Sequence, residues 1–314
     1  MSEVAIDVRE LRKQFSLDLR DVRSRKRTAL DGMTLKVERG EIYGFLGPNG
    51  AGKTTTIKIL TSLLRSDSGT AAIFGSAPWE EAARRRIGYL PESPIFYDHL
   101  TGREFLRFCG KLCGLGGQDL NRRADTMLER VGLKNAADMQ IRRYSKGMTQ
   151  RVGIAQAILH DPDLVILDEP MSGLDPMGRA DVRDIIIDLK RAGKTIFFST
   201  HIIPDVEAIC SRIGIVNHGR MVREGTVAEL LNESVSGATE VLAQSLPDAF
   251  SVPDVEESVA VGGRRMFVAP SAPALDTLLN GILQVKGTVV SVTPRRSSLE
   301  ELVVKLLATK ENAQ

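Results

Sequence analysis

Three glycines, a lysine and a threonine occur together in the octapeptide GPNGAGKT, Gly47–Thr54, with the spacing of a phosphate-binding loop. The glycines at 47, 50 and 52 would let the backbone bend so that successive N–H groups point at phosphate oxygens. The helix expected to begin after the last glycine adds a partial positive charge at the same place. The loop therefore predicts a site for a nucleotide polyphosphate.

Within this loop, Lys53 can supply a mobile charge for the β- and γ-phosphates, and the Thr54 hydroxyl can ligate Mg²⁺. We therefore expect ATP and Mg²⁺ as bound species. The residues expected to hold the nucleotide are Gly47, Pro48, Asn49, Gly50, Ala51, Gly52, Lys53, Thr54 and Thr55. The alternative is a glycine-rich turn that contains lysine and threonine by chance. A predicted strand before the loop and a predicted helix after it disfavour that alternative.

A pair of carboxylates, Asp168 and Glu169, ends the apolar run LVILDEP. Ligands of open α/β sheets bind beyond the carboxyl ends of the strands, so this pair should face the same crevice as the phosphate loop. Successive side chains of a strand point to different sides. Asp168 is therefore expected to reach the metal and Glu169 to meet an attacking water. Two solvated acids that merely close a strand are the alternative.

The elements that must position these groups alternate along the chain. Strands are predicted at VAIDVREL, ALDGMTLKVERG and EIYGFLG, with turn signals at Asp31-Gly32 and Arg39-Gly40. A helical period follows from Lys53, and the segment from about Thr101 to His160 is mainly helical in pattern. Strand signals return at LVILDEP, TIFFSTH and RIGIVNH. This order predicts an α/β fold: a P-loop NTPase core with a mostly parallel sheet covered on both faces and an inserted helical subdomain.

The composition changes after about Leu231. The stretch NESVSGATEVLAQSLPDAFSVPD is small and polar and is interpreted as a linker or a loosely packed start. A hairpin turning at Gly262-Gly263 follows, then a helix, a strand and a final helix from Ser298, which forms a capping-box pattern with Glu301. We expect a nucleotide-binding domain at 1–231, with the helical subdomain at about 98–160, and a small α+β accessory domain at 232–314.

Composition excludes several classes of protein. The chain has 314 residues and a formal net charge of only +2, so nucleic acid is not expected as a partner. No apolar run approaches the roughly 20 residues that cross a bilayer, and the first residues do not resemble a secretory signal. Three cysteines, Cys109, Cys113 and Cys210, suit no zinc framework. Cys109 and Cys113 favour apolar filling over a metal or redox pair.

Further motifs identify a family. YSKGMTQR (Tyr144–Arg151), SGLD (Ser172–Asp175) and His201 in STH follow the loop and the acidic strand in order. Over roughly Val4 to Leu231 the chain resembles the nucleotide-binding subunit of ATP-binding cassette (ABC) transporters, with these three elements similar to its signature, D-loop and switch histidine.

The resemblance implies a head-to-tail homodimer in which each ATP lies between the phosphate loop of one copy and the signature of the other. Ser145 and Gly147 would contact the γ-phosphate across that interface, and Asp175 would join the two sites. Glu169 would polarise the attacking water. His201 would hold the γ-phosphate or the geometry of the transition state, although a structural histidine is the alternative interpretation for a lone His.

The sequence departs from the family pattern at three places. Lys146 and Met148 replace the commonest Gly and Gln of the signature. Glu92 stands where the family has a Mg²⁺-linked glutamine, so a carboxylate is expected near the metal. The adenine-stacking aromatic is best matched by Phe15, for which a plain core phenylalanine is the alternative. The basic stretch Arg20–Arg27 lies between Phe15 and the phosphate loop. It is interpreted as an inserted, solvated loop or, alternatively, as a contact with an anionic membrane surface.

The resemblance implies the ATPase subunit of an exporter whose permease is a separate, small integral membrane protein. The chain is then expected in the cytoplasm, peripheral on the inner face of the cell membrane. Two alternatives stay open. A soluble cassette ATPase not coupled to transport usually carries two cassettes or a long coiled coil. A regulatory module would bind ATP without turnover, which the presence of Glu169 and His201 disfavours.

Overall fold

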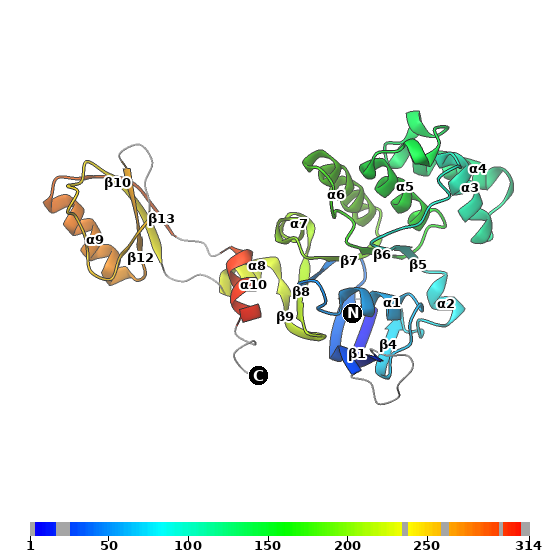
Figure 1. Cartoon of the computed structure of the whole chain (residues 1–314), viewed down its shortest axis with the longest axis horizontal. Helices are drawn as coiled ribbons and strands as arrows, with labels where there is room; N and C mark the ends of the chain where they lie inside the picture. The colour runs from blue at the N-terminus through cyan, green and yellow to red at the C-terminus, as the bar shows by residue number, and fades with distance from the viewer. Residues whose placement is uncertain (1–3, 17–25, 234–237, 259–263, 295–297, 309–314) are drawn as a thin grey trace. The chain divides into compact units, whose positions relative to one another are not determined.

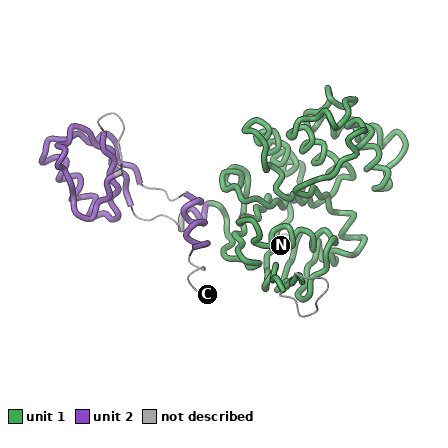
Figure 2. The backbone as a smooth tube through the Cα atoms, viewed as in Figure 1, with its two compact units in different colours: residues 1–227 green, residues 228–314 purple. Residues whose placement is uncertain are grey.

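The computed structural model describes residues 4–16, 26–233, 238–258, 264–294 and 298–308 (Figure 1). The chain divides into two compact units, residues 1–227 and 228–314 (Figure 2). This division lies four residues before the boundary expected at Leu231, within α8 (Val227–Glu233).

A six-stranded sheet forms the centre of the first unit, in the order β5-β6-β7-β3-β8-β9. All neighbouring strands are parallel except β9, which is antiparallel to β8. The strands are β3 (Ile42–Leu46), β5 (Ile87–Leu90), β6 (Leu164–Asp168), β7 (Thr195–Thr200), β8 (Arg212–Asn217) and β9 (Arg220–Thr226). The predicted mostly parallel sheet is confirmed, but β5 and β9 were not predicted.

Each face of this sheet has its own hydrophobic core. In β6, Val165 and Leu167 belong to one core, while Leu164 and Ile166 belong to the other, because side chains alternate along a strand. The first core contains the helices α3 (Gly102–Leu112), α4 (Gly117–Arg130), α5 (Lys146–Ile158) and α6 (Pro176–Arg191). The second contains α1 (Lys53–Leu60) and a smaller sheet. Helices therefore cover one face, and a helix with a second sheet covers the other.

The smaller sheet is antiparallel, in the order β2-β1-β4, and consists of β1 (Val4–Ser16), β2 (Lys26–Glu38) and β4 (Ser68–Ile73). The turn predicted at Asp31-Gly32 is wrong. Both residues lie inside β2, where the register with β1 shifts and Gly32 has a φ of 78°. A glycine with positive φ serves a β-bulge as well as a turn, so the dipeptide alone does not separate the two. Arg39-Gly40 is a turn as predicted.

The rest of this unit consists of the inserted helices and two short helices that connect strands. The short helices are α2 (Glu81–Arg84) and α7 (Ile203–Ile209). The helical pattern expected from Thr101 to His160 is confirmed by α3, α4 and α5 (Figure 1). Cys109 packs against the core, and burial raises the pKa of its thiol to about 11. The packed thiol of Cys109 fits the filler interpretation, whereas Cys113 is exposed, so the interpretation is wrong for Cys113. Of the basic stretch Arg20–Arg27, residues 20–25 lie outside the described residues.

The second unit is a four-stranded antiparallel sheet in the order β11-β12-β10-β13, packed against α9 (Ala272–Gln284). Its strands are β10 (Thr239–Gln244), β11 (Glu256–Ser258), β12 (Arg264–Ala269) and β13 (Thr288–Pro294), and α10 (Leu299–Ala308) is its last helix. The α+β pattern matches these elements. The linker interpretation is wrong for β10, whose Val241 and Ala243 are fully buried. The predicted turn at Gly262-Gly263 lies outside the described residues, although β11 and β12 do pair. The Ser298 hydroxyl accepts the Glu301 N–H at 3.2 Å.

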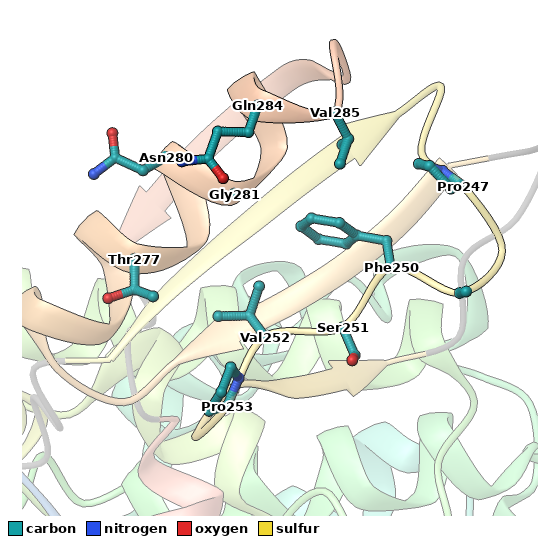
Figure 3. A pocket seen from close by; sticks show the side chains of 11 residues that line it. Pro247, Phe250, Ser251, Val252, Pro253, Thr277, Asn280, Gly281, Gln284 and Val285 are labelled. Carbon is teal, nitrogen blue, oxygen red and sulfur yellow. The ribbon is translucent and has the colours of Figure 1, made fainter.

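A cavity of about 610 Å³ lies in the second unit between α9 and residues 247–253 (Figure 3). Phe250 and Val252 point into it from the loop, and Asn280 and Gln284 come from the helix (Figure 3). A Cβ at Gly281 would lie 3.4 Å from the Phe250 ring, an ordinary van der Waals contact. None of the predicted nucleotide-site residues lines this cavity.

Candidate nucleotide site

The phosphate loop connects β3 to α1 at the carboxyl end of the parallel sheet. Gly50 and Gly52 have φ values of 82° and 105°, a region that glycine adopts without strain. Gly47 is required for a different reason, because a Cβ there would collide with the carbonyl of Val216 on β8. No side chain caps α1, whose N-cap is Gly52. Its first N–H groups are therefore available to an anion.

A cavity of about 480 Å³ opens beside this loop. It brings together side chains from segments far apart in the sequence: Phe15, Arg27, Ala29, Asn49, Gly50, Gly52, Lys53, Thr54, Thr55, Glu92 and Glu169. Phe15 is 40% exposed, so it is a wall of this cavity and not a core residue. Gly47, Pro48 and Ala51 belong to the loop but do not line the cavity.

Lys53 is buried and already surrounded by oxygen atoms. Its Nζ donates to the carbonyls of Gly47 at 2.7 Å and Pro48 at 3.3 Å, and lies 3.2 Å from Glu169 Oε1. A bound phosphate would therefore compete with Glu169 for the same ammonium group. Lys53 and Glu169 are therefore direct neighbours in the site.

Asp168 is completely buried at the end of β6. The Ser199 hydroxyl donates to its Oδ1 at 2.5 Å. Burial raises the pKa of Asp168, and the hydroxyls of Ser199 and Thr54 counteract part of that rise. The Oδ2 atom is buried and has no hydrogen-bond partner among the described residues. Such an atom is costly unless something binds it.

These oxygens fit a magnesium ion. The unpartnered Asp168 Oδ2 and the Thr54 hydroxyl are hard oxygen donors, and the carboxylate of Glu92 is close enough to raise the pKa of Asp168 further. Mg²⁺ is usually held by one or two carboxylates together with substrate phosphates. The described residues contain no group of three or more His, Cys, Asp or Glu side chains that could hold a metal by themselves.

Glu169 contacts both His201 and Lys53. Its Oε2 lies 2.9 Å from His201 Nδ1, and its Oε1 faces Lys53. Because an ionised carboxylate only accepts, Nδ1 carries the proton in this contact. Glu169 has a φ of 50°, which is unusual for a residue other than glycine. The positive φ turns the chain at the strand end, so the two acids do not simply continue the alternation of β6.

Ser199 was missed in the sequence, yet it connects the two acids. Its hydroxyl donates to Asp168 and also accepts the Glu169 N–H at 3.1 Å, and its carbonyl accepts the same N–H at 3.2 Å. Ser199 is fully buried in β7. A serine in a strand carries no motif of its own. Only its position two residues before His201, on the strand next to β6, could have suggested it.

Ser145, Gly147 and Asp175 lie apart from the residues that line this cavity. Ser145 is the N-cap of α5, where its hydroxyl accepts the Met148 N–H at 3.2 Å. Asp175 is the N-cap of α6 and accepts the Gly178 N–H at 2.8 Å. Both side chains are exposed. They hold helix ends within this chain, and their expected contacts with nucleotide are not made from the same cavity as the loop.

The chain was compared with known proteins. Residues 30–172 match the ABC transporter family. The chain is 40% identical to an uncharacterised ABC transporter ATP-binding protein of Synechocystis, over 90% of this chain and 80% of the relative. It is 35% identical to the daunorubicin resistance ATP-binding protein DrrA3 of Streptomyces coeruleorubidus, over 98% of this chain and 96% of that protein. A solved ATP binding subunit of an ABC transporter superposes with a TM-score of 0.63 and 32% identity, over 73% of this chain and 92% of that one.

The fold and the site define a P-loop ATPase with a parallel core sheet and an inserted helical subdomain. The chain belongs to the ATP-binding proteins of ABC transporters. It binds ATP and hydrolyses it, as this family does. Among the residues that the structure describes, no helix has the length and apolar character needed to span a membrane.

Proposed function

We propose that this chain is the ATP-hydrolysing subunit of an exporter, and that two copies pair head to tail around two ATP molecules. The observation that supports the pairing is the separation within one chain. The loop, Glu169 and Phe15 share a cavity, whereas Ser145 and Gly147 do not line it. A second copy could place its exposed Ser145 and the uncovered start of α5 over the phosphates, where N–H groups favour an anion.

Hydrolysis would proceed at the γ-phosphorus. Glu169 takes a proton from water while the water oxygen bonds to phosphorus, and the bond to the β–γ bridging oxygen breaks to give ADP and phosphate. Lys53 compensates the charge on the phosphates, and the imidazole of His201 holds Glu169 in place. Mg²⁺, held by Asp168 and Thr54, with Glu92 nearby, would neutralise phosphate charge when bound. Turnover that survives removal of Mg²⁺ by EDTA would contradict its role.

Phe15 is proposed to stack on adenine, because its exposed ring stands in the wall of the same cavity as the loop. A base stacked on an aromatic ring contributes about 1–3 kcal/mol. Loss of the ring without loss of affinity for ATP would argue against this assignment.

The head-to-tail arrangement predicts that two inactive variants restore each other. Lys53→Ala damages the phosphate loop and Ser145→Arg blocks the signature. In a mixed dimer, one composite site contains both lesions and the other contains neither. With random pairing in an equal mixture, half of the dimers would be mixed and would have one of two sites intact. Because Lys53→Ala binds ATP weakly, we expect recovery of up to about a quarter of the wild-type ATPase rate. The measurement is phosphate release after mixing.

The matched control is Lys53→Ala mixed with Glu169→Gln. Both lesions lie on the same side of the interface, so every composite site stays damaged and no activity should return. Recovery in this control, or none in the first mixture, would exclude the head-to-tail arrangement.

We further propose that the helical subdomain contacts a separate integral membrane permease, which would place the chain at the inner face of the cell membrane. The proposed surface consists of Ile95, Tyr97, Phe108 and Leu112, which are 97%, 53%, 38% and 74% exposed. The rings of Tyr97 and Phe108 lie 5.1 Å apart, and Leu112 is one turn further along α3. Exposed apolar groups at a segment that follows Glu92 could pass movement from the nucleotide site to a partner.

Cross-linking tests this surface. A cysteine at Ile95, in a chain whose Cys113 is replaced by serine, should cross-link to a cytoplasmic helix of the co-purified membrane protein. A cysteine at Lys36, on the exposed side of β2, is the control and should not. Equal labelling from both sites, or contacts confined to the control site, would exclude the surface. The relative in Streptomyces coeruleorubidus is a daunorubicin resistance protein. Removal of a drug from the cell would provide such resistance, which supports export as the direction.

A further inference from the structure

Arg27 lies in the wall of the nucleotide cavity, although the sequence placed it in a basic insertion. It is the second residue of β2 and pairs directly with Phe15 on β1. One terminal nitrogen of its guanidinium lies 3.3 Å from the point that a Cβ on Gly50 would occupy. Arg27 therefore stands between the ring proposed for adenine and the tip of the phosphate loop.

No carboxylate among the described residues neutralises the charge of Arg27. Three other cations on or beside the small sheet have carboxylate partners: Lys13 lies 2.6 Å from Asp67, and Arg12 and Arg220 both pair with Asp31. Arg27 forms no ion pair with any residue in the described ranges, and its side chain is exposed. An unpaired guanidinium beside a phosphate loop is a ready partner for an anion.

The charges on the protein lining of the cavity, counted without a metal ion, balance only when Arg27 is included. Its lining contains the carboxylates of Glu92 and Glu169 and the cations of Lys53 and Arg27. Lys53 already lies 3.2 Å from Glu169. Without Arg27 the lining would carry more negative than positive charge, which opposes a polyphosphate. Arg27 restores the balance at the open end, where Lys53 does not reach.

We propose that Arg27 binds the phosphate chain of the nucleotide from β2, as a second cation at the mouth of the cavity. The proposal rests on the ATP site described above and adds a residue to it. A guanidinium can donate two parallel hydrogen bonds to phosphate oxygens, which an ammonium cannot do. The residue therefore fixes the position of the phosphates relative to the base, and acts on ATP and ADP alike.

The test compares nucleotide affinities of the full chain and its Arg27→Gln variant by calorimetry. We expect the variant to bind ADP and ATP about three- to tenfold more weakly, since an exposed charged hydrogen bond is of modest strength. Adenosine, measured by competition, should bind both proteins equally. The dependence of ADP affinity on salt should become less steep in the variant, and Arg27→Lys should recover part of the loss.

Lys26→Gln is the matched control. It removes the same charge one residue earlier on the same strand, and successive side chains of a strand point to opposite faces. Its ADP affinity should stay at the wild-type value. The proposal is overturned if Arg27→Gln binds ADP with wild-type affinity, or if Arg27→Gln and Lys26→Gln lose the same amount of ADP affinity. It is also overturned if Arg27→Gln loses as much affinity for adenosine as for ADP, which would indicate that Arg27 stacks on the base. Wild-type binding in the same series separates these outcomes from a failure of the ATP site itself.

Discussion

Replacing Glu169 with glutamine is expected to slow steady-state ATP hydrolysis by a factor of about 10²–10⁴ while ATP binding is retained or strengthened. The amide keeps the shape of the side chain in a site that is 6% exposed, but it cannot take a proton from water. It also removes one negative charge beside the phosphates and frees Lys53, which lies 3.2 Å from Glu169.

Because each ATP would be enclosed by two copies, blocked hydrolysis should trap a dimer. The variant should elute as a dimer with ATP and as a monomer without it, by size-exclusion chromatography with light scattering. Glu92→Gln is the matched control, since it removes the same charge from the same cavity without removing the proposed base. Normal turnover in Glu169→Gln, or tight ATP binding by a monomer, would contradict the roles given to this residue.

Lys53→Ala should have the opposite effect on binding. The lysine is the only cation that the buried part of the described cavity contributes, and removing one partner of a desolvated charge pair between a protein and its ligand costs about 2–5 kcal/mol of binding free energy. We therefore expect ATP affinity to fall by about 10²-fold or more. Without bound ATP, no trapped dimer should form, even when Glu169 is also replaced by glutamine.

The fold should survive this change, because Glu169 keeps its contact with His201 and the loop backbone keeps its glycines. Thermal unfolding monitored by circular dichroism is the check. Lys58, exposed in the last turn of the same helix, provides the control, and Lys58→Ala should bind ATP normally. ATP hydrolysis at the wild-type rate by Lys53→Ala would contradict the assignment of the phosphate loop.

The parts of the site that the sequence predicts are those encoded by adjacent residues. Gly47–Thr54 and the pair Asp168 and Glu169 form local patterns whose chemistry follows from their spacing. Ser199 could not be recognised in this way, because its partners lie about thirty residues away in the chain. Arg27 was misassigned for the same reason: its position depends on strand pairing with β1, which no local pattern reports.

The same distinction holds for the fold. Buried parallel strands such as β6 can be predicted from their apolar runs, and the helices of the insertion from their hydrophobic periodicity. The β2-β1-β4 sheet depends on pairing between Val4–Ser16 and Ser68–Ile73. A polar composition concealed β10, because only Val241 and Ala243 face its core. Side chains on its other face dominate the appearance of that segment.

The two hydrogen bonds of the Ser199 hydroxyl link the positions of several groups in the site. Its hydroxyl holds Asp168 and the backbone of Glu169 at once, and His201 lies on the same stretch of chain. A displacement of β7 would therefore move the metal ligand, the base and the histidine in step. The same strand also pairs with β3, and its Thr200 carbonyl accepts the N–H of Gly47 at 3.2 Å. One strand of the sheet therefore sets the spacing between the phosphate loop, the two acids and the histidine.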